Sequence, residues 1–148
     1  MEKVIVEWFK IDNDAEIPQY AHHGDAGFDL KAMEDILLYP GERKAVRTGL
    51  KVGIPHGYEM QIRPRSGMSL ISPILIANAP GTIDSGYRGE VKIIMFNTGS
   101  AGDEPWKIRK GDRIAQGVIA KLPEVVHVEV QTLTETTRGA NGFGSTGL

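Results

Sequence analysis

The chain has 148 residues, of which 41% are hydrophobic and 24% charged, and its formal net charge is −2 at pH 7. These values are typical of one soluble globular domain, and the weak negative charge argues against nucleic acid or a membrane as partner. The absence of cysteine excludes disulfides and zinc–thiolate sites, and the acidic start without a long apolar run predicts a cytoplasmic protein with no signal peptide or membrane span.

Short alternating or β-branched segments follow one another along the chain, separated by 18 glycines and 8 prolines. They predict strands near residues 4–9, 44–47, 57–63, 90–96, 113–120 and 125–131. In the last of these, Val126, Val128 and Val130 share one face, which is the period of a strand. One short helix is expected over residues 66–71, capped by Ser66 and ended by Pro73. Many short strands with turn signals predict an all-β sandwich, barrel or jelly roll.

Two polar segments interrupt the strand patterns in the first half of the chain. In residues 24–30, Asp29 stands between apolar neighbours and is suited to hold a metal-bound water, although an acid in a turn has the same signature. In residues 63–69, Arg63 and Arg65 precede Ser66 at the expected helix start, where free N–H groups favour an anion. This pattern predicts a phosphate contact, and the alternative is a surface arginine beside a helix cap.

The densest polar segment spans residues 78–90 and contains three glycines. It is predicted to be a hairpin that carries Asp84 and Tyr87 at its tip. A carboxylate there can align and deprotonate a water, and the tyrosine ring can lie flat on a sugar; the alternative is that Asp84 only closes the turn. Further on, Gln116 is an uncharged amide within a strand, which indicates either a ligand contact or the outer face of an edge strand.

The last residues, 138–148, combine glycines and hydroxyls with Arg138 and Phe143. Such a segment cannot bury a core, but its N–H groups and Arg138 are suited to close around a phosphate chain while Phe143 stacks on a flat group. A frayed terminus is the alternative. Residues 142–147 match G-x-G-x-x-G, yet no helix can follow, so a dinucleotide fingerprint is excluded. We expect a β domain over 1–133 and a flexible C-terminal arm over 134–148.

Five segments in order resemble the motifs of trimeric deoxyuridine triphosphatases. They are Ala26-Gly-Phe-Asp-Leu, Pro64-Arg-Ser-Gly-Met, Gly81-Thr-Ile-Asp-Ser-Gly-Tyr-Arg-Gly-Glu, Gly111-Asp-Arg-Ile-Ala-Gln and Arg138-Gly-Ala-Asn-Gly-Phe-Gly-Ser-Thr-Gly. The resemblance implies a distorted jelly-roll or β-clip-like barrel, assembled as a homotrimer with active sites at subunit interfaces. It also implies hydrolysis of dUTP to dUMP and pyrophosphate, with Mg²⁺ on the triphosphate. Such a reaction lowers dUTP and supplies dUMP for dTMP synthesis.

The resemblance further implies a role for each matching residue. Asp84 is expected to activate the attacking water, and Tyr87 to lie against the deoxyribose and exclude a 2′-hydroxyl. The uracil edge is expected to be read by one group of residues: Asn78, Gly81, Thr82 and Ile83.

The remaining matching residues are expected to bind the triphosphate and cover the base. Within the β domain the phosphate contacts are Arg65, Ser66, Gly67 and Gln116. In the arm, Arg138 is expected to grip the γ end and Phe143 to cover the uracil, assisted by Gly144, Ser145 and Thr146. The metal is held mainly by phosphate oxygens and waters, with Asp29 involved only through water.

Two positions depart from the family pattern, and the alternatives to this function are few. Gly86 stands where many relatives carry an acid, and Asn141 stands where the arm usually has glycine.

The related deoxycytidine triphosphate deaminases need a glutamate near the position of Ile94, which cannot transfer protons. A regulatory binding protein or a ligand-free structural β-trimer remains as an alternative, although Asp84, Arg65 and Arg138 are all present.

Overall fold

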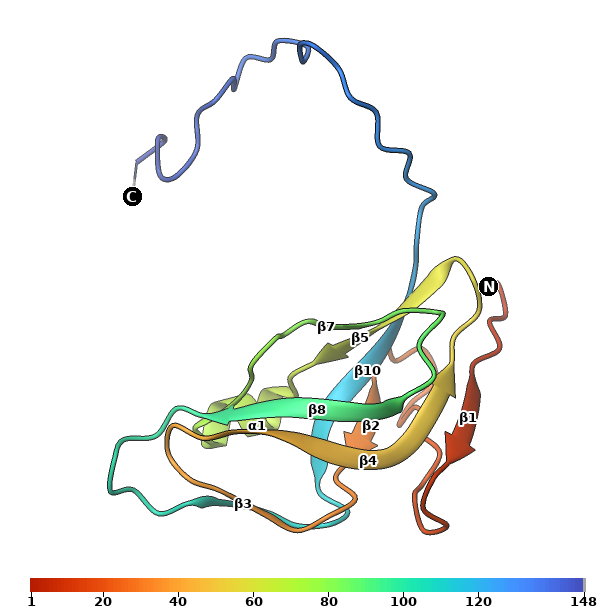
Figure 1. Ribbon diagram of the computed structural model, residues 1–148, viewed down its shortest axis with the longest axis vertical. Helices are drawn as coiled ribbons and strands as arrows, with labels where there is room; N and C mark the ends of the chain where they lie inside the picture. The colour runs from red at the N-terminus through yellow and green to blue at the C-terminus, as the bar shows by residue number, and fades with distance from the viewer. Residues whose placement is uncertain (148) are drawn as a thin grey trace.

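Short apolar strands form two four-stranded antiparallel sheets and one two-stranded ribbon in the computed structural model, which describes residues 1–147 (Figure 1). Sheet A has the order β1 (Glu7–Lys10), β4 (Arg43–Gly53), β8 (Glu90–Asn97) and β6 (Ile74–Ile76). Sheet B has the order β2 (Phe28–Lys31), β10 (Arg113–Lys121), β5 (Tyr58–Arg63) and β7 (Gly81–Ile83). The ribbon pairs β3 (Ile36–Leu38) with β9 (Trp106–Ile108), and one helix, α1 (Ser66–Ile71), follows β5.

The core lies between the two sheets and is built by strand alternation. Along β8, Val91, Ile93 and Met95 are buried, and the residues between them are half-buried or exposed. Truncating such a residue, for example Ile93→Ala, costs about 2–5 kcal/mol. Buried polar side chains are bonded: the Thr48 hydroxyl donates to Val91 O at 2.6 Å, and the Asn97 amide donates to Leu38 O at 2.7 Å.

The all-β class with one short helix is confirmed, as are the strands predicted near residues 4–9, 44–47, 57–63, 90–96 and 113–120. The helix occupies Ser66–Ile71 as predicted, but Ser66 is not its cap. Arg65 holds the N-cap position, with no side-chain capping hydrogen bond, and Ser66 is the first helical residue. The strands β2, β3, β6, β7 and β9 are only three or four residues long and were not predicted.

Two predicted strand features are wrong. Residues 125–131 form no strand; they are exposed throughout, because no neighbouring strand lies beside them to complete a ladder. The segment around Asp84 is not a hairpin, because β7 belongs to sheet B and β8 to sheet A. Asp84 and Tyr87 therefore lie in a connection that crosses from one sheet to the other.

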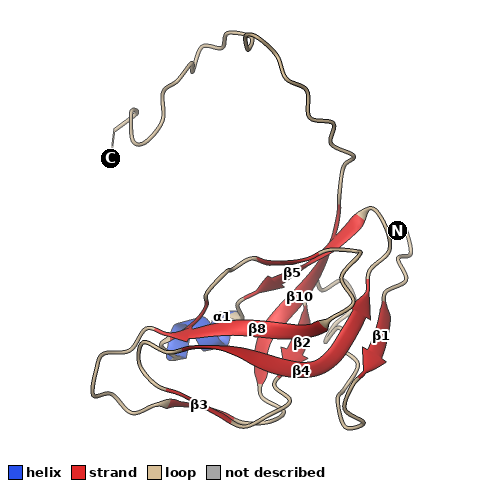
Figure 2. Ribbon diagram, in the orientation of Figure 1, coloured by secondary structure: helices blue, strands red, loops and turns tan. Residues whose placement is uncertain are grey.

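After β10 the chain leaves the β sandwich. Leu122 N still donates to Gly57 O at 2.8 Å, and residues 123–147 then extend away as an irregular segment without helix or strand (Figure 2). No helix within residues 1–147 is long and apolar enough to cross a membrane.

Candidate active site

An arginine cluster forms where β2, β5 and β10 meet at one end of sheet B. Arg65 Nε donates to Asp29 Oδ1 at 2.7 Å, and Arg113 Nη1 lies 3.6 Å from Asp29 Oδ2. Arg65 and Asp29 are partly buried, with 24% and 31% of their side chains exposed. Asp29 accepts from Nε, and Nη1 donates weakly to Arg113 O at 3.5 Å. Arg65 thus keeps further N–H donors, on Nη2, that suit an anion.

Gln116 lies beside this cluster on β10, an inner strand of sheet B. It is opposite Asp29 on β2 and opposite Arg63 on β5. Its amide donates to Pro64 O at 2.8 Å, which ties β10 to the start of α1. Gly27 packs beneath it, since a Cβ at that position would lie 3.2 Å from Gln116 Cδ. The predicted phosphate residues Arg65, Ser66, Gly67 and Gln116 are thus together at one end of the sheet.

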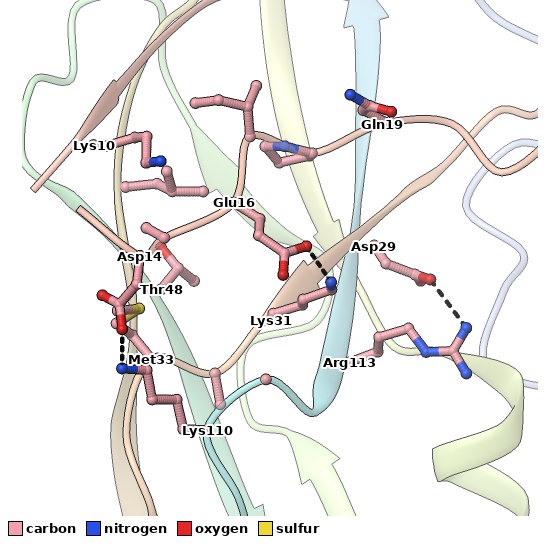
Figure 3. Close-up of a pocket in the computed structure, with 16 residues that line it drawn as sticks. Lys10, Asp14, Glu16, Gln19, Asp29, Lys31, Met33, Thr48, Lys110 and Arg113 are labelled. Carbon is pink, nitrogen blue, oxygen red and sulfur yellow. Dashed lines mark hydrogen bonds and ion pairs between the residues drawn. The ribbon is translucent and has the colours of Figure 1, made fainter. Parts of the chain in front are cut away.

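A cavity of about 910 Å³, lined in part by Asp29 and Arg113, adjoins this cluster (Figure 3). It lies between the N-terminal loop and the ends of β2 and β10. Three oppositely charged pairs line it: Asp29 with Arg113, Glu16 with Lys31, and Asp14 with Lys110. Asp29 is the one predicted site residue in its lining.

The predicted catalytic and sugar residues lie on the β7–β8 connection. Asp84 is exposed, and its turn is closed by the backbone, with Tyr87 N donating to Asp84 O at 3.1 Å. The Tyr87 hydroxyl donates to Glu90 O at 2.9 Å, which fixes the ring at the start of β8. Asn78 precedes β7, and its side-chain nitrogen lies against Gly81. Gly81, Thr82 and Ile83 form β7 itself.

The arm residues form a third group, separate from the other two. Arg138 Nε donates to Asn141 O at 3.0 Å, and Ser145 N donates to Gly142 O at 3.0 Å. These turns curl the end of the arm around a hollow of about 510 Å³, whose lining includes Arg138, Phe143, Gly144, Ser145 and Thr146. Phe143 is fully exposed with a positive φ of 50°. Residue 148 of the predicted arm lies outside the described residues.

One copy of the chain does not bring these three groups together. β7 runs antiparallel to β5, with Ile83 opposite Met60, so Asp84 lies beyond that pair and away from Arg63. Met60 and Arg63 are separated by about 10 Å along β5. Asp84 continues from β7 past Met60 toward the start of β5, whereas Arg65 follows the end of β5. The arm curls well away from both groups in Figure 1.

Several residues that shape the site were not predicted. Arg113 stands within a motif for which the sequence predicts no role for this side chain, and its pairing with Asp29 depends on the β2–β10 register. Arg47 and Glu90 form an ion pair behind Tyr87, with Arg47 Nε 3.0 Å from Glu90 Oε1. Arg47 and Glu90 lie 43 positions apart, and the signal in the sequence for their contact is a single glycine, Gly49, in the irregular part of β4. No local pattern indicates the contact of Arg113 with Asp29.

The model of the dUTPase family matches residues 13–147 of this chain. A deoxyuridine 5'-triphosphate nucleotidohydrolase of Clostridium novyi is 52% identical over 146 residues, covering 99% of both chains. The enzyme of the same name from Thermobifida fusca is 50% identical over 144 residues, covering 97% of this chain and 79% of the relative.

Solved structures with the same fold come from staphylococcal phages. A mutant dUTPase of Staphylococcus bacteriophage 80alpha, solved with dUpNHpp, superposes with a TM-score of 0.89 at 28% identity, covering 97% of this chain and 99% of the other. A mutant dUTPase of phage phi11 of S. aureus, described with a coordinated structural Mg(II) ion, gives a TM-score of 0.79 at 26% identity. That match covers 86% of this chain and 97% of the other.

Proposed function

Because this chain belongs to the dUTPase family, we propose that it hydrolyses dUTP to dUMP and pyrophosphate, lowering dUTP and supplying dUMP for dTMP synthesis. The observation that carries the proposal is the arginine cluster with Gln116. Three segments far apart in sequence place a carboxylate, two guanidinium groups and an amide at one end of sheet B. Such a set suits a phosphate chain, because planar guanidinium forks match phosphate oxygens. The reaction is proposed to take place in the cytoplasm.

Asp84 is the proposed general base of the reaction. Its carboxylate accepts a proton from a water, the water oxygen bonds to the α-phosphorus, and the bond to the bridging oxygen breaks so that pyrophosphate leaves. Proton transfer by a positioned carboxylate contributes about 10²–10⁴-fold to the rate. The exposure of Asp84 suits this role, because its turn is closed by backbone atoms and the carboxylate stays free for the water.

The β6–β7–β8 segment is proposed to select the nucleoside. Backbone groups of β7, with the Asn78 side chain, read the uracil edge, where a 5-methyl would have no room. Tyr87 lies against the deoxyribose and excludes a 2′-hydroxyl. A site that leaves polar groups unpaired with the wrong ligand discriminates by as much as ~10⁴-fold.

Arg65, Ser66, Gly67 and Gln116 are proposed to hold the phosphates. The Asp29 carboxylate, partly exposed and held by arginines, keeps lone pairs that suit a metal-bound water. Mg²⁺ bound with the triphosphate would supply positive charge that stabilises the leaving pyrophosphate, and Asp29 would contact it only through a water.

A homotrimer is the proposed assembly, with each active site shared between copies. Two features support it: the separation of Asp84 from Arg65 along sheet B, and the exposed alternating side chains of Val126, Val128 and Val130. A strand pattern with no partner in its own chain suits a neighbouring sheet edge. The arm, with Arg138 and Phe143, then closes over a site on another copy and excludes water from it.

The decisive experiment measures pyrophosphate release with Mg²⁺ and a panel of dUTP, dTTP, dCTP and UTP. We expect selective hydrolysis of dUTP, and Asp84→Asn is expected to remove most turnover while fold and nucleotide binding remain. Asp103→Asn is the matched control, because Asp103 accepts a hydrogen bond from Ser100 N in an exposed turn. Near-normal turnover of Asp84→Asn would show that Asp84 only closes its turn.

A further inference from the structure

Tyr87 is held at two points by its own segment. Its hydroxyl donates to Glu90 O at 2.9 Å, and its ring covers Gly89. A Cβ at residue 89 would lie 2.6 Å from Tyr87 Cζ and 2.9 Å from Cε2, so only glycine leaves room for this ring position. The placement of the ring therefore depends on where the backbone of Glu90 is fixed.

The Glu90 side chain is fixed by three hydrogen bonds across sheet A. Arg47 Nε donates to Oε1 at 3.0 Å and to Oε2 at 3.2 Å, and Gly49 N donates to Oε1 at 2.9 Å. Only 13% of the carboxylate side chain is exposed. Charge-assisted hydrogen bonds of this kind are about twice as strong as neutral ones, so they set the position of residue 90 at the start of β8.

An irregularity in β4 makes this contact possible. The β4–β8 register shifts between Arg47, which is opposite Lys92, and Lys51, which is opposite Glu90. Gly49 lies in this bulge with a φ of 69°, a conformation that favours glycine. The bulge releases the Gly49 N–H from the strand ladder, and the Glu90 carboxylate accepts it instead.

The network continues from Arg47 into the N-terminal loop. Arg47 Nη2 donates to Asp12 Oδ2 at 2.8 Å, and Ile11 N donates to Gly49 O at 2.8 Å. Hydrogen bonds to Glu90, together with its negative charge, raise the pKa of the Arg47 guanidinium. The N-terminal loop, the β4 bulge and the β7–β8 connection are thus one connected structure behind Tyr87.

We propose that Arg47 and Glu90 are positioning residues that hold the Tyr87 ring against the substrate sugar and thereby set discrimination against a 2′-hydroxyl. The proposal rests on the proposed function of Tyr87. It assigns the accurate placement of the Tyr87 ring against the sugar to an ion pair that lies outside the substrate site. A ring that shifts even slightly no longer excludes the extra hydroxyl. Asp84 directly follows β7, whose pairing with β5 does not involve Glu90, and the phosphate contacts lie on other segments, so both are expected to stay in place. Discrimination between sugars is therefore expected to fall while turnover of dUTP is kept.

The test compares Glu90→Gln with the wild type by the ratio of kcat/KM for dUTP to that for UTP. Glutamine keeps the size of the side chain but loses the charge and one acceptor oxygen. We expect the ratio to fall about 10-fold, with kcat for dUTP within about 3-fold of the wild type. Gly89→Ala is expected to lower the ratio as well, because the added methyl displaces the ring directly.

Glu42→Gln is the matched control, since Glu42 accepts a hydrogen bond from Tyr39 N and lies 3.6 Å from Lys44 at the other end of β4. It is expected to leave the ratio unchanged. If Gly89→Ala lowers the ratio and Glu90→Gln does not, the ion pair supports only the fold and the inference is overturned. Should Glu90→Gln fail to fold, Arg47→Lys answers the same question, because it keeps the charge but loses the Nε contact.

Hydrogen exchange separates this inference from the proposed function. A wild-type chain that hydrolyses dUTP and UTP equally would contradict the sugar role of Tyr87. Amide exchange over residues 85–89 still decides whether the ion pair positions the segment. Faster exchange there in Glu90→Gln, with unchanged exchange in β10, supports the inference, and identical exchange overturns it.

Discussion

Arg65 donates from Nε to Asp29 Oδ1 at 2.7 Å across 36 positions of sequence, and this bond fixes the direction of the guanidinium at the end of sheet B. The same carboxylate lies 3.6 Å from Arg113, so one acid organises two cations. A phosphate chain bound there, as proposed, would meet donors that are already oriented, and it would not need to order them itself.

Asp29→Asn is expected to lower kcat/KM for dUTP by about 10–10²-fold, because Arg65 loses the charged partner that orients it. The amide has nearly the same volume, so the temperature of unfolding should change little. Steady-state kinetics and thermal unfolding check both parts. Glu16→Gln, which removes an exposed partner of Lys31, is the control and should leave kcat/KM unchanged. Equal kinetics for both variants would mean that Arg65 is oriented without Asp29.

Mixing two inactive variants tests whether the active site is shared between copies. Asp84→Asn supplies an intact Arg65, and Arg65→Ala supplies an intact Asp84. After joint unfolding and refolding at equal amounts, random assembly should leave about one quarter of the sites with both native residues. Pyrophosphate release should therefore recover to about a quarter of the wild-type rate. A mixture as inactive as its components would place both residues of each site in one chain.

Deleting residues 137–148 should leave stability nearly unchanged and remove most dUTP hydrolysis. The described part of this segment is almost entirely exposed, so its loss uncovers little apolar surface. Phe143→Ala should lose the stacking contribution, about 1–3 kcal/mol of transition-state stabilisation by analogy with base–aromatic contacts. Arg138→Ala should lose more, because a phosphate charge is left unpaired. Calorimetry and kcat/KM check these expectations; full activity after deletion would identify the arm as a frayed end.

The pH dependence of stability should reveal one surface contact of the N-terminus. Tyr58 Oη donates to Glu2 Oε1 at 2.8 Å, and Lys121 Nζ donates to Glu2 Oε2 at 3.1 Å. These contacts lower the pKa of Glu2 below its ordinary 4.5. A carboxyl group whose pKa is lower in the folded than in the unfolded chain stabilises the fold at pH values above its unfolded pKa. This stabilisation is lost as the pH falls through its folded pKa. Glu2→Gln should therefore lower Tm slightly at pH 7, and the difference should disappear in acid once the pH lies well below the folded pKa of Glu2. A difference that persists in acid would exclude the carboxylate charge as its source.

The sequence predicted long strands well and spatial relationships poorly. The alternation in residues 90–96 defined β8, because that strand buries one face in the core. The apolar residues of 113–120 defined β10, although Ile114 and Ala115 are both buried beside a register shift. The same alternation in residues 125–131 predicted a strand that the single chain does not form, since periodicity reports the preference of a segment and not the presence of a partner.

For the candidate site, too, the sequence indicated the residues but not their arrangement in space. The motifs around Arg65 and Asp84 were visible as polar interruptions, but their arrangement depends on register. Whether Asp84 lies near Arg65 is decided by the pairing of Ile83 with Met60, which no local pattern encodes. The contact between Arg47 and Glu90 likewise requires the bulge in β4, and its signal in the sequence is a single glycine at position 49.

The length of the segment that follows β10 limits how far Arg138 can lie from the β sandwich. Leu122 is anchored to Gly57, and residues 122–137 span about 50 Å when extended at ~3.3 Å per residue. A globular domain of this size has a radius of gyration of about 14 Å, so Arg138 can travel beyond the far side of its own sandwich. In the proposed trimer, the number of residues between Leu122 and Arg138 would decide which copy the arm can reach, so insertions or deletions there would change its target without altering any proposed site residue.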